Sequence, residues 1–104
     1  MRKVTRNIVA CFLTDTKVNE GNSSVSIEYD SSVGSVTYLK LHGNNIARKL
    51  TGNKNMFEIC NGGWFSNTTK ERLNGLPNVS IQQKKGLWYL NGEVWDGGWT
   101  LINL

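Results

Sequence analysis

Residues 25–41 read Val-Ser-Ile-Glu-Tyr-Asp-Ser-Ser-Val-Gly-Ser-Val-Thr-Tyr-Leu-Lys-Leu, which is two β-type segments joined by small residues. In the first segment Val25, Ile27 and Tyr29 alternate with Ser and Glu, which is the period of a strand with one buried face. Residues 31–34 then form a short link into a second pleated segment at residues 35–41. This stretch therefore predicts an antiparallel β-hairpin.

Short strand signals continue on both sides of this hairpin. Residues 7–13 are an apolar run with β-branched members, which predicts a buried strand. Asn91-Gly92 is a strong signal for a two-residue hairpin turn. Further strands are predicted at residues 46–50, 56–60, 79–83, 87–90, 93–95 and 99–103. Together these segments predict an antiparallel sheet of about six to eight strands.

Residues 61–77 interrupt the strand pattern and predict one short α-helix, at about residues 68–75. Thr68 and Glu71 have the spacing of a capping box, in which each side chain bonds a free backbone N–H of the other residue. Asn74-Gly75 predicts a left-handed stop, and Pro77 cannot continue a helix. The predicted fold class is α+β, in a single domain of residues 1–104 that is mainly antiparallel sheet.

The composition is typical of one compact globular domain. Of the 104 residues, 38% are hydrophobic and 19% are charged, which is enough apolar surface for a core and too little charge for a disordered chain. The longest apolar run, residues 8–13, is far short of the roughly 18 residues that a membrane span needs. The net charge of +4 favours anionic partners. Cys11 and Cys60 cannot build a disulfide framework, so we expect both to be reduced and packed in a cytosolic protein.

Most enzyme classes lack their motifs in this chain. One His and two widely separated Cys do not supply a zinc site, and no nucleophile elbow, Walker loop or dinucleotide fingerprint is present. His42 could act as a general base or pair with Cys60, but no second catalytic group accompanies His42. Cys60 ends an apolar strand, which favours a core role. We predict a protein that is not an enzyme and that holds no metal or cofactor.

The segment at residues 62–72 is the most informative for function. A helix N-terminus presents unpaired amides and a partial positive charge, and the hydroxyls and cation that follow here could complete a phosphate site. A histidine at the end of a strand can also hydrogen-bond a phosphate or a base edge. In the alternative, Thr68 only caps the helix and the cations are solvated. The predicted ligand-binding residues are His42, Trp64, Thr68, Thr69, Lys70 and Arg72.

A second candidate surface lies around the predicted hairpin at residues 81–90. Trp88 and Tyr89 must point to opposite faces of one strand, and Lys84 and Lys85 occupy the adjacent tip. An exposed aromatic ring beside these cations would resemble a stacking platform for single-stranded bases or a partner contact. In the alternative, the aromatic residues serve packing. The residues expected in the core are Trp64, Trp95 and one of Trp88 or Tyr89.

Four motifs carry a resemblance to known proteins. They are Leu41-His42-Gly43-Asn44-Asn45-Ile46-Ala47, Gly62-Gly63-Trp64, Thr68-Thr69-Lys70-Glu71-Arg72-Leu73-Asn74 and Gln82-Gln83-Lys84-Lys85-Gly86-Leu87-Trp88-Tyr89. This pattern resembles a family of small uncharacterised tailed-bacteriophage proteins and covers residues 36–97. The resemblance implies a phage origin and a bacterial host cytoplasm, and it carries over no activity. Residues 1–35 depart from the shorter family members and would add a strand or hairpin as a partner-binding edge.

These observations predict a bacteriophage accessory protein that binds a phosphate-bearing ligand, nucleic acid or nucleotide, without catalysis. Such binding would interfere with nucleic-acid-based processes or defence in the host. The alternative is a protein-directed inhibitor of the anti-CRISPR or anti-restriction type, which occupies a functional surface of a host bacterial protein through a sheet edge and exposed aromatics. Its positive charge argues against a DNA mimic. We expect no membrane partner and allow a homodimer through an exposed strand.

Overall fold

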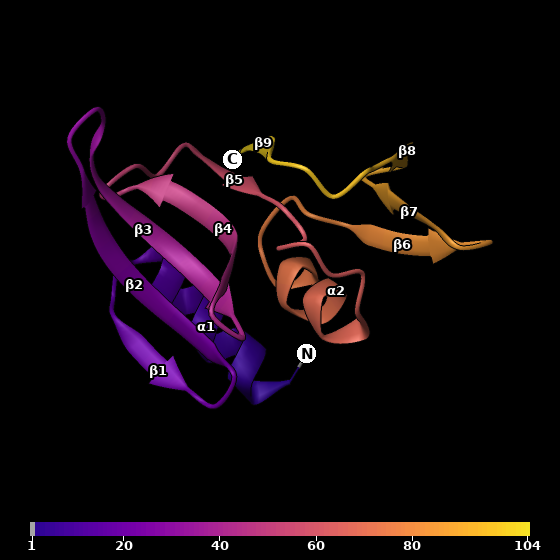
Figure 1. Ribbon diagram of the computed structural model, residues 1–104, viewed down its shortest axis with the longest axis horizontal. Coiled ribbons are helices and arrows are strands. Elements are labelled where there is room, and N and C mark those ends of the chain that lie inside the picture. Colours follow the sequence, from indigo (N-terminus) through magenta and orange to yellow (C-terminus); the bar gives the residue numbers. More distant parts are fainter. Residues whose placement is uncertain (1) are drawn as a thin grey trace.

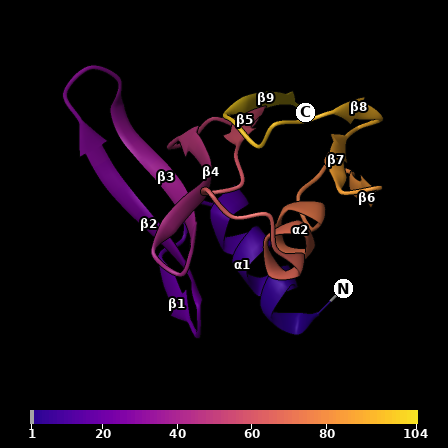
Figure 2. The same cartoon turned by 45° about the vertical axis from the view of Figure 1, so that its right-hand side comes forward.

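The computed structural model describes residues 2–104, which form a six-stranded sheet, a three-stranded sheet and two helices (Figure 1). The α+β class is thereby confirmed. Helix α1 runs along one face of the larger sheet, and α2 lies between the two sheets (Figures 1 and 2). In chain order the elements are α1 (Lys3–Leu13), β1 (Val18–Glu20), β2 (Ser23–Asp30), β3 (Gly34–Leu41), β4 (Asn44–Leu50), β5 (Met56–Ile59), α2 (Asn67–Asn74), β6 (Ile81–Lys84), β7 (Leu87–Leu90), β8 (Glu93–Val94) and β9 (Thr100–Asn103).

The larger sheet is built around the β2–β3 hairpin that the sequence predicts. Its strands follow the order β1-β2-β3-β4-β5-β9, and every neighbouring pair is antiparallel. Val25 lies opposite Leu39, and Ile27 lies opposite Thr37, so the alternating residues share one face of the sheet. The register of β3 and β4 shifts between Leu39 and Lys40, where Ile46 of β4 is the extra residue of a β-bulge. Strands β1 and β9 form the two edges.

The prediction of a buried strand at residues 7–13 is wrong, because this segment belongs to helix α1. Its buried residues are Thr5, Ile8, Val9 and Phe12, which recur at helical spacing and form one stripe against the sheet. The Phe12 ring meets the Phe57 ring edge to face at 5.9 Å. A short apolar run does not by itself distinguish a strand from a buried helix face, and here packing against the sheet decides the outcome.

The prediction of a single sheet is also wrong, because the strands of the described residues form two sheets. The order β6-β7-β8 makes a separate antiparallel unit that projects beyond α2 (Figure 1). Its two turns, Lys85-Gly86 and Asn91-Gly92, have both residues at positive φ, which is type I′ geometry, and the second is the two-residue turn predicted at Asn91-Gly92. Strand β1 has no counterpart in the sequence-based prediction.

One core joins α1, both sheets and α2. Trp88 and Trp95 lie in it with their ring centroids 6.3 Å apart, as predicted. Neither cysteine is bridged; Cys60 is buried and Cys11 is half-buried. Of the N-terminal part, residues 2–35 supply α1, β1 and β2 to this same core. The helices described have 11 and 8 residues, too few to cross a bilayer.

Candidate functional site

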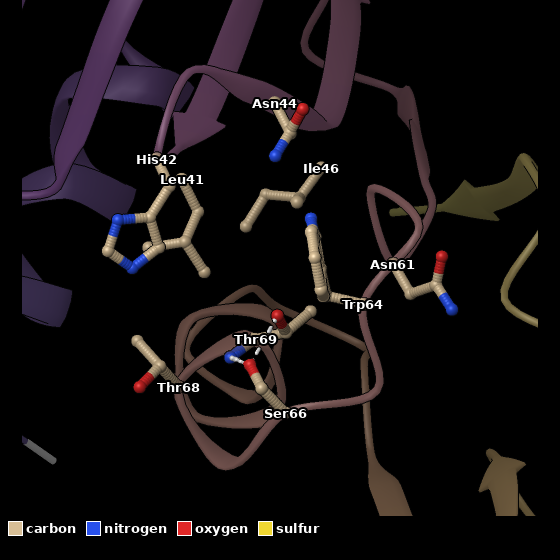
Figure 3. A pocket seen from close by; sticks show the side chains of 9 residues that line it. All are labelled: Leu41, His42, Asn44, Ile46, Asn61, Trp64, Ser66, Thr68 and Thr69. Atoms are coloured by element: carbon tan, nitrogen blue, oxygen red, sulfur yellow. Dashed lines mark hydrogen bonds between the residues drawn. The ribbon is translucent and has the colours of Figure 1, made fainter.

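A cleft of about 450 Å³ lies between the β3–β4 hairpin, the loop after β5 and the start of α2. Figure 3 shows His42 on one side of it and Trp64 on the other. Three hydroxyl residues of α2 and its cap lie below them in this view. The lining residues are Leu41, His42, Asn44, Ile46, Asn61, Trp64, Ser66, Thr68 and Thr69.

His42 reaches the cleft because it occupies the two-residue turn between β3 and β4. Its φ is 51° and that of Gly43 is 79°, which again is the type I′ pattern. The His42 backbone N–H donates to the Asn22 carbonyl oxygen at 2.7 Å, which fastens this turn to the neighbouring turn between β1 and β2. The imidazole is exposed and stands at the edge of the cleft (Figure 3). Histidine is among the residues that tolerate this left-handed conformation best.

Trp64 is placed by a tight turn in the loop between β5 and α2. The Asn61 Oδ1 accepts from the Gly63 N–H at 2.8 Å, and the Trp64 N–H donates to the Asn61 carbonyl oxygen at 3.2 Å. A Cβ on Gly62 would lie 3.1 Å from the Ile46 side chain, so the missing side chain lets the loop approach β4 closely.

The prediction that Trp64 belongs to the core is wrong, because 65% of this residue is exposed. Gly62 and Gly63 both have positive φ and turn the chain so that the indole forms a wall of the cleft. The next residue, Phe65, is also 56% exposed. Two adjacent aromatic residues left this accessible are typical of a binding surface rather than of a fold requirement.

The start of α2 differs from the predicted capping box. Ser66 is the cap, and its hydroxyl oxygen accepts from the Thr69 N–H at 3.1 Å. Thr68 lines the cleft one residue inside the helix, and the Thr69 hydroxyl is bonded to that of Ser66 at 2.9 Å. Glu71 does not reach back to the helix start. The helix also ends without a left-handed residue, since Gly75 has a φ of −75°.

The Arg72 side chain lies in the interior and not in the cleft, with only 2% of its side-chain surface exposed. Its guanidinium donates to the Thr5 hydroxyl at 2.8 Å and to the Ser23 hydroxyl at 3.0 Å, and it is 3.1 Å from the Glu71 carboxylate. Burial raises the pKa of Glu71, but the hydrogen bond from Thr5 and the charges of Arg72 and Arg2 hold it below its usual value overall. This cluster ties α2 to α1 and β2.

Lys70 also turns away from the cleft lining, toward the small sheet. Its ammonium donates to the Gln83 Oε1 at 2.9 Å and lies 5.7 Å from the centroid of the Trp88 ring. The Phe65 ring packs edge to face on that same Trp88 ring, with centroids 4.8 Å apart. A second group of predicted site residues therefore gathers beside the cleft, around the buried Trp88.

The remaining predicted residues lie on the β6–β7 hairpin, but on different parts of its surface. Lys85 lies in the exposed turn, at a φ of 51°. Tyr89 pairs with Gln82 and Lys84 pairs with Leu87, which puts both on the opposite face of the hairpin from Trp88. Tyr89 is half-buried there. The structure thus brings His42, Trp64, Thr68 and Thr69 together, and it leaves Lys84 and Tyr89 on a different surface.

The chemistry of the lining suits an uncharged planar group. His42 is its one titratable side chain, and no carboxylate, lysine or arginine lines the cleft. Leu41 and Ile46 form an apolar part of the lining, and the Asn44 carboxamide reaches toward the space between the two rings (Figure 3). Within residues 2–104, no group of three or more His, Cys, Asp or Glu residues is placed to hold a metal ion.

Cys60 does not join His42 in the cleft lining. Its thiol is buried and donates to the Asn45 carbonyl oxygen at 3.1 Å. Burial raises the pKa of this thiol, and the Gly62 backbone N–H and the Arg48 charge offset only part of that rise. The sulfur is therefore held protonated in the fold, which does not suit a nucleophile.

Sequence reasoning missed Leu41, Asn44, Ile46, Asn61 and Ser66 as lining residues. The signal for Leu41 and Asn44 was present, because a two-residue turn at His42-Gly43 makes them direct partners across the hairpin. The contribution of Asn61 has no local signal. It depends on Gly97, whose carbonyl oxygen accepts from the Asn61 N–H at 2.9 Å.

Comparisons with known proteins identify the family. No curated protein and no solved structure matches the chain. The model of the family described as Kyanoviridae Gp96 protein matches residues 1–101, which includes both the β3–β4 turn and the loop that form the cleft. The chain therefore belongs to the Kyanoviridae Gp96 protein family, a family of phage proteins.

Proposed function

We propose that this phage protein binds a nucleobase-bearing ligand in the cleft between His42 and Trp64, without catalysis, in the cytoplasm of the bacterial host. The ligand is a nucleotide or a base of a nucleic acid, and its capture interferes with host nucleic-acid-based processes or defence. The observation that carries the proposal is the placement of two aromatic rings across one cleft that no carboxylate lines.

The size and chemistry of the cleft support this proposal. Its volume of about 450 Å³ falls within the range of small-molecule sites. A base stacked on an aromatic side chain gains about 1–3 kcal/mol, and the polar edge of the base can bond the Asn44 carboxamide or the Thr68 hydroxyl. Burial of part of the exposed indole adds to this gain.

Binding without turnover is supported by the isolation of His42. General acid–base catalysis needs a titratable group within hydrogen-bond reach of the reacting atoms, and most such sites combine two. The cleft lining offers the imidazole alone. The hydroxyls of Ser66 and Thr69 are bonded to each other and hold the helix start, so neither is activated by a base.

Calorimetric titration with the common ribo- and deoxyribonucleoside monophosphates tests the proposal. Trp64→Leu removes the stacking surface and should weaken binding about tenfold or more, because roughly 1.4 kcal/mol is a factor of ten. Trp99→Leu is the matched control, since this exposed tryptophan packs on Arg48 outside the cleft. No detectable binding of any of these nucleotides by the unchanged protein would refute the proposal.

A second candidate function is favoured by the exposure of Trp64 and Phe65 together. Adjacent exposed aromatics are also the usual anchors of protein–protein interfaces. In this case the cleft would receive a side chain of a host defence or transcription protein. A stoichiometric complex with a host protein that is lost in Trp64→Leu, together with a failure to bind nucleotides, would favour this candidate.

A further inference from the structure

We infer that the ligand of the cleft is a single-stranded polynucleotide, whose chain continues from the cleft over Phe65 to Lys70 and the Lys85 turn. We call these three residues the Phe65 track. The inference rests on the proposed function, since it takes one base of the strand as the occupant of the cleft. It adds the substrate class and the path of the backbone.

The first step beyond the cleft is a fixed aromatic ring. Phe65 follows Trp64 directly in the chain, and 56% of it is exposed. Its ring packs edge to face on Trp88, which is itself buried against Trp95. An exposed ring that is held in one orientation loses little conformational entropy on binding, so Phe65 suits a second base stacked next to the first.

The next step is positive charge without a carboxylate partner. Lys70 bonds the neutral Gln83 and lies over the Trp88 ring, and Lys85 lies in an exposed turn. Within the described residues neither forms a salt bridge, whereas Arg2, Lys40, Arg48, Lys49 and Arg72 each do. Both track cations are therefore available to phosphate groups.

The position of these cations separates a polynucleotide from a mononucleotide. No lysine or arginine lines the cleft, so the cleft itself offers no cation to the phosphate of a nucleotide whose base lies between His42 and Trp64. Lys70 lies by the same Trp88 ring on which Phe65 packs, and its ammonium bonds Gln83 of β6. Cations gathered around the second stacking ring match the phosphates that follow in a strand. Stacking on both rings requires unpaired bases, which selects a single strand over a duplex.

Fluorescence anisotropy with labelled octamers of deoxythymidine and of uridine tests this path, and a duplex of the same length is the comparison. The track variant is Lys70→Gln with Lys85→Asn, where asparagine suits the left-handed turn position. The control variant is Lys17→Gln with Lys54→Gln, which removes the same charge from exposed residues outside the track. Circular dichroism verifies that each variant is folded.

We expect both octamers, or one of them, to bind more tightly than the monophosphate and the duplex. Each phosphate contact to a single strand contributes about 0.7 to the slope of log affinity against log salt. Loss of two contacts should lower that slope by about 1.4. When the salt is raised from 50 to 200 mM, the fold-loss of affinity should therefore be about seven times smaller for the track variant than for the unchanged protein. The control variant should keep the original slope, and monophosphate binding should be equal in all three proteins.

Four outcomes would overturn the inference. Equal affinity for octamer and monophosphate, with no effect of the track variant, would leave the nucleotide-binding cleft standing and remove the track. Octamer binding that is unchanged in Trp64→Leu would show that the bound strand places no base in the cleft. Equal effects of the track and control variants would show only diffuse attraction to the basic protein. If neither octamer nor monophosphate binds, the proposed function itself fails, and the track fails with it.

Discussion

Replacing Arg72 with methionine should destabilise the fold strongly, although the sequence marks this residue as a ligand contact. The guanidinium makes two short hydrogen bonds, to Thr5 and Ser23, and an ion pair with Glu71. Hydrogen bonds of this kind to a charged group contribute roughly 1.5–3 kcal/mol each, so loss of both should cost at least about 3 kcal/mol. Methionine fills much of the space but satisfies none of these polar partners.

A loss of at least about 3 kcal/mol is a large part of the roughly 5–15 kcal/mol that stabilises a domain of this size. Near the melting temperature each kcal/mol shifts the midpoint by about 4–8 °C, so thermal denaturation should show a drop of at least roughly 12 °C. Urea denaturation followed by circular dichroism gives the free energy of unfolding directly. Lys70→Met is the control on the same helix, because the Lys70 ammonium bonds only the exposed Gln83. A loss below about 1 kcal/mol for Arg72→Met would refute the structural role assigned to the buried guanidinium.

Three further predictions concern pH, packing and the turn. The folded protein holds the pKa of Asp15 and Glu71 below their usual values of 3.8 and 4.5. Their contribution to stability is therefore present above about pH 4.5 and is lost as the pH falls through the folded-state values. The urea concentration at the unfolding midpoint, measured from about pH 7 to about pH 2.5, should decrease over this pH range. Gly75→Ala should destabilise the fold by about 1–3 kcal/mol despite the better helix propensity of alanine, because its Cβ would lie 2.6 Å from the Thr5 methyl, and an unchanged melting temperature would contradict this. His42→Asn keeps the left-handed turn and should leave the melting temperature within a few degrees, while it weakens nucleotide binding measured by calorimetry.

The parts of the fold that could be predicted from sequence are those that local chemistry determines. The β2–β3 hairpin follows from the alternation of Val25, Ile27 and Tyr29. The Asn91-Gly92 turn follows from the ease with which both residues adopt positive φ. In each case the signal lies within a few residues and does not depend on what packs against it.

Helix α1 could not be predicted in this way, because local signals oppose it. No acidic residue lies in its first turn, where Lys3 and Arg6 face the positive end of the helix dipole. No side chain caps its start. The helix is stabilised instead by the buried stripe that includes Ile8 and Phe12, which the sheet covers only once the chain has folded.

The candidate site also has residues that local motifs predict and one residue whose position depends on packing. His42, Trp64, Thr68 and Thr69 were predicted from short motifs and do meet at one cleft. The side of an eight-residue helix that faces the core is not fixed by its own sequence, and arginine is among the residues least often buried. The buried face of α2 contains Thr69, Arg72 and Leu73, so the arginine that sequence reasoning placed at a ligand holds the helix instead.

The same contacts link the stability of the fold to the shape of the cleft. One wall is the His42 turn, whose backbone N–H is fixed by the Asn22 carbonyl oxygen. The start of α2 forms another part of the cleft, and further along this helix the Arg72 guanidinium bonds Ser23 and reaches the Asn22 Oδ1 at 3.4 Å. The His42 turn and α2 therefore both contact Asn22, which directly precedes β2. Because a shift of the His42 turn relative to α2 would break one of these contacts, this part of the cleft is ordered before a ligand binds, and less of the binding free energy is spent on ordering it.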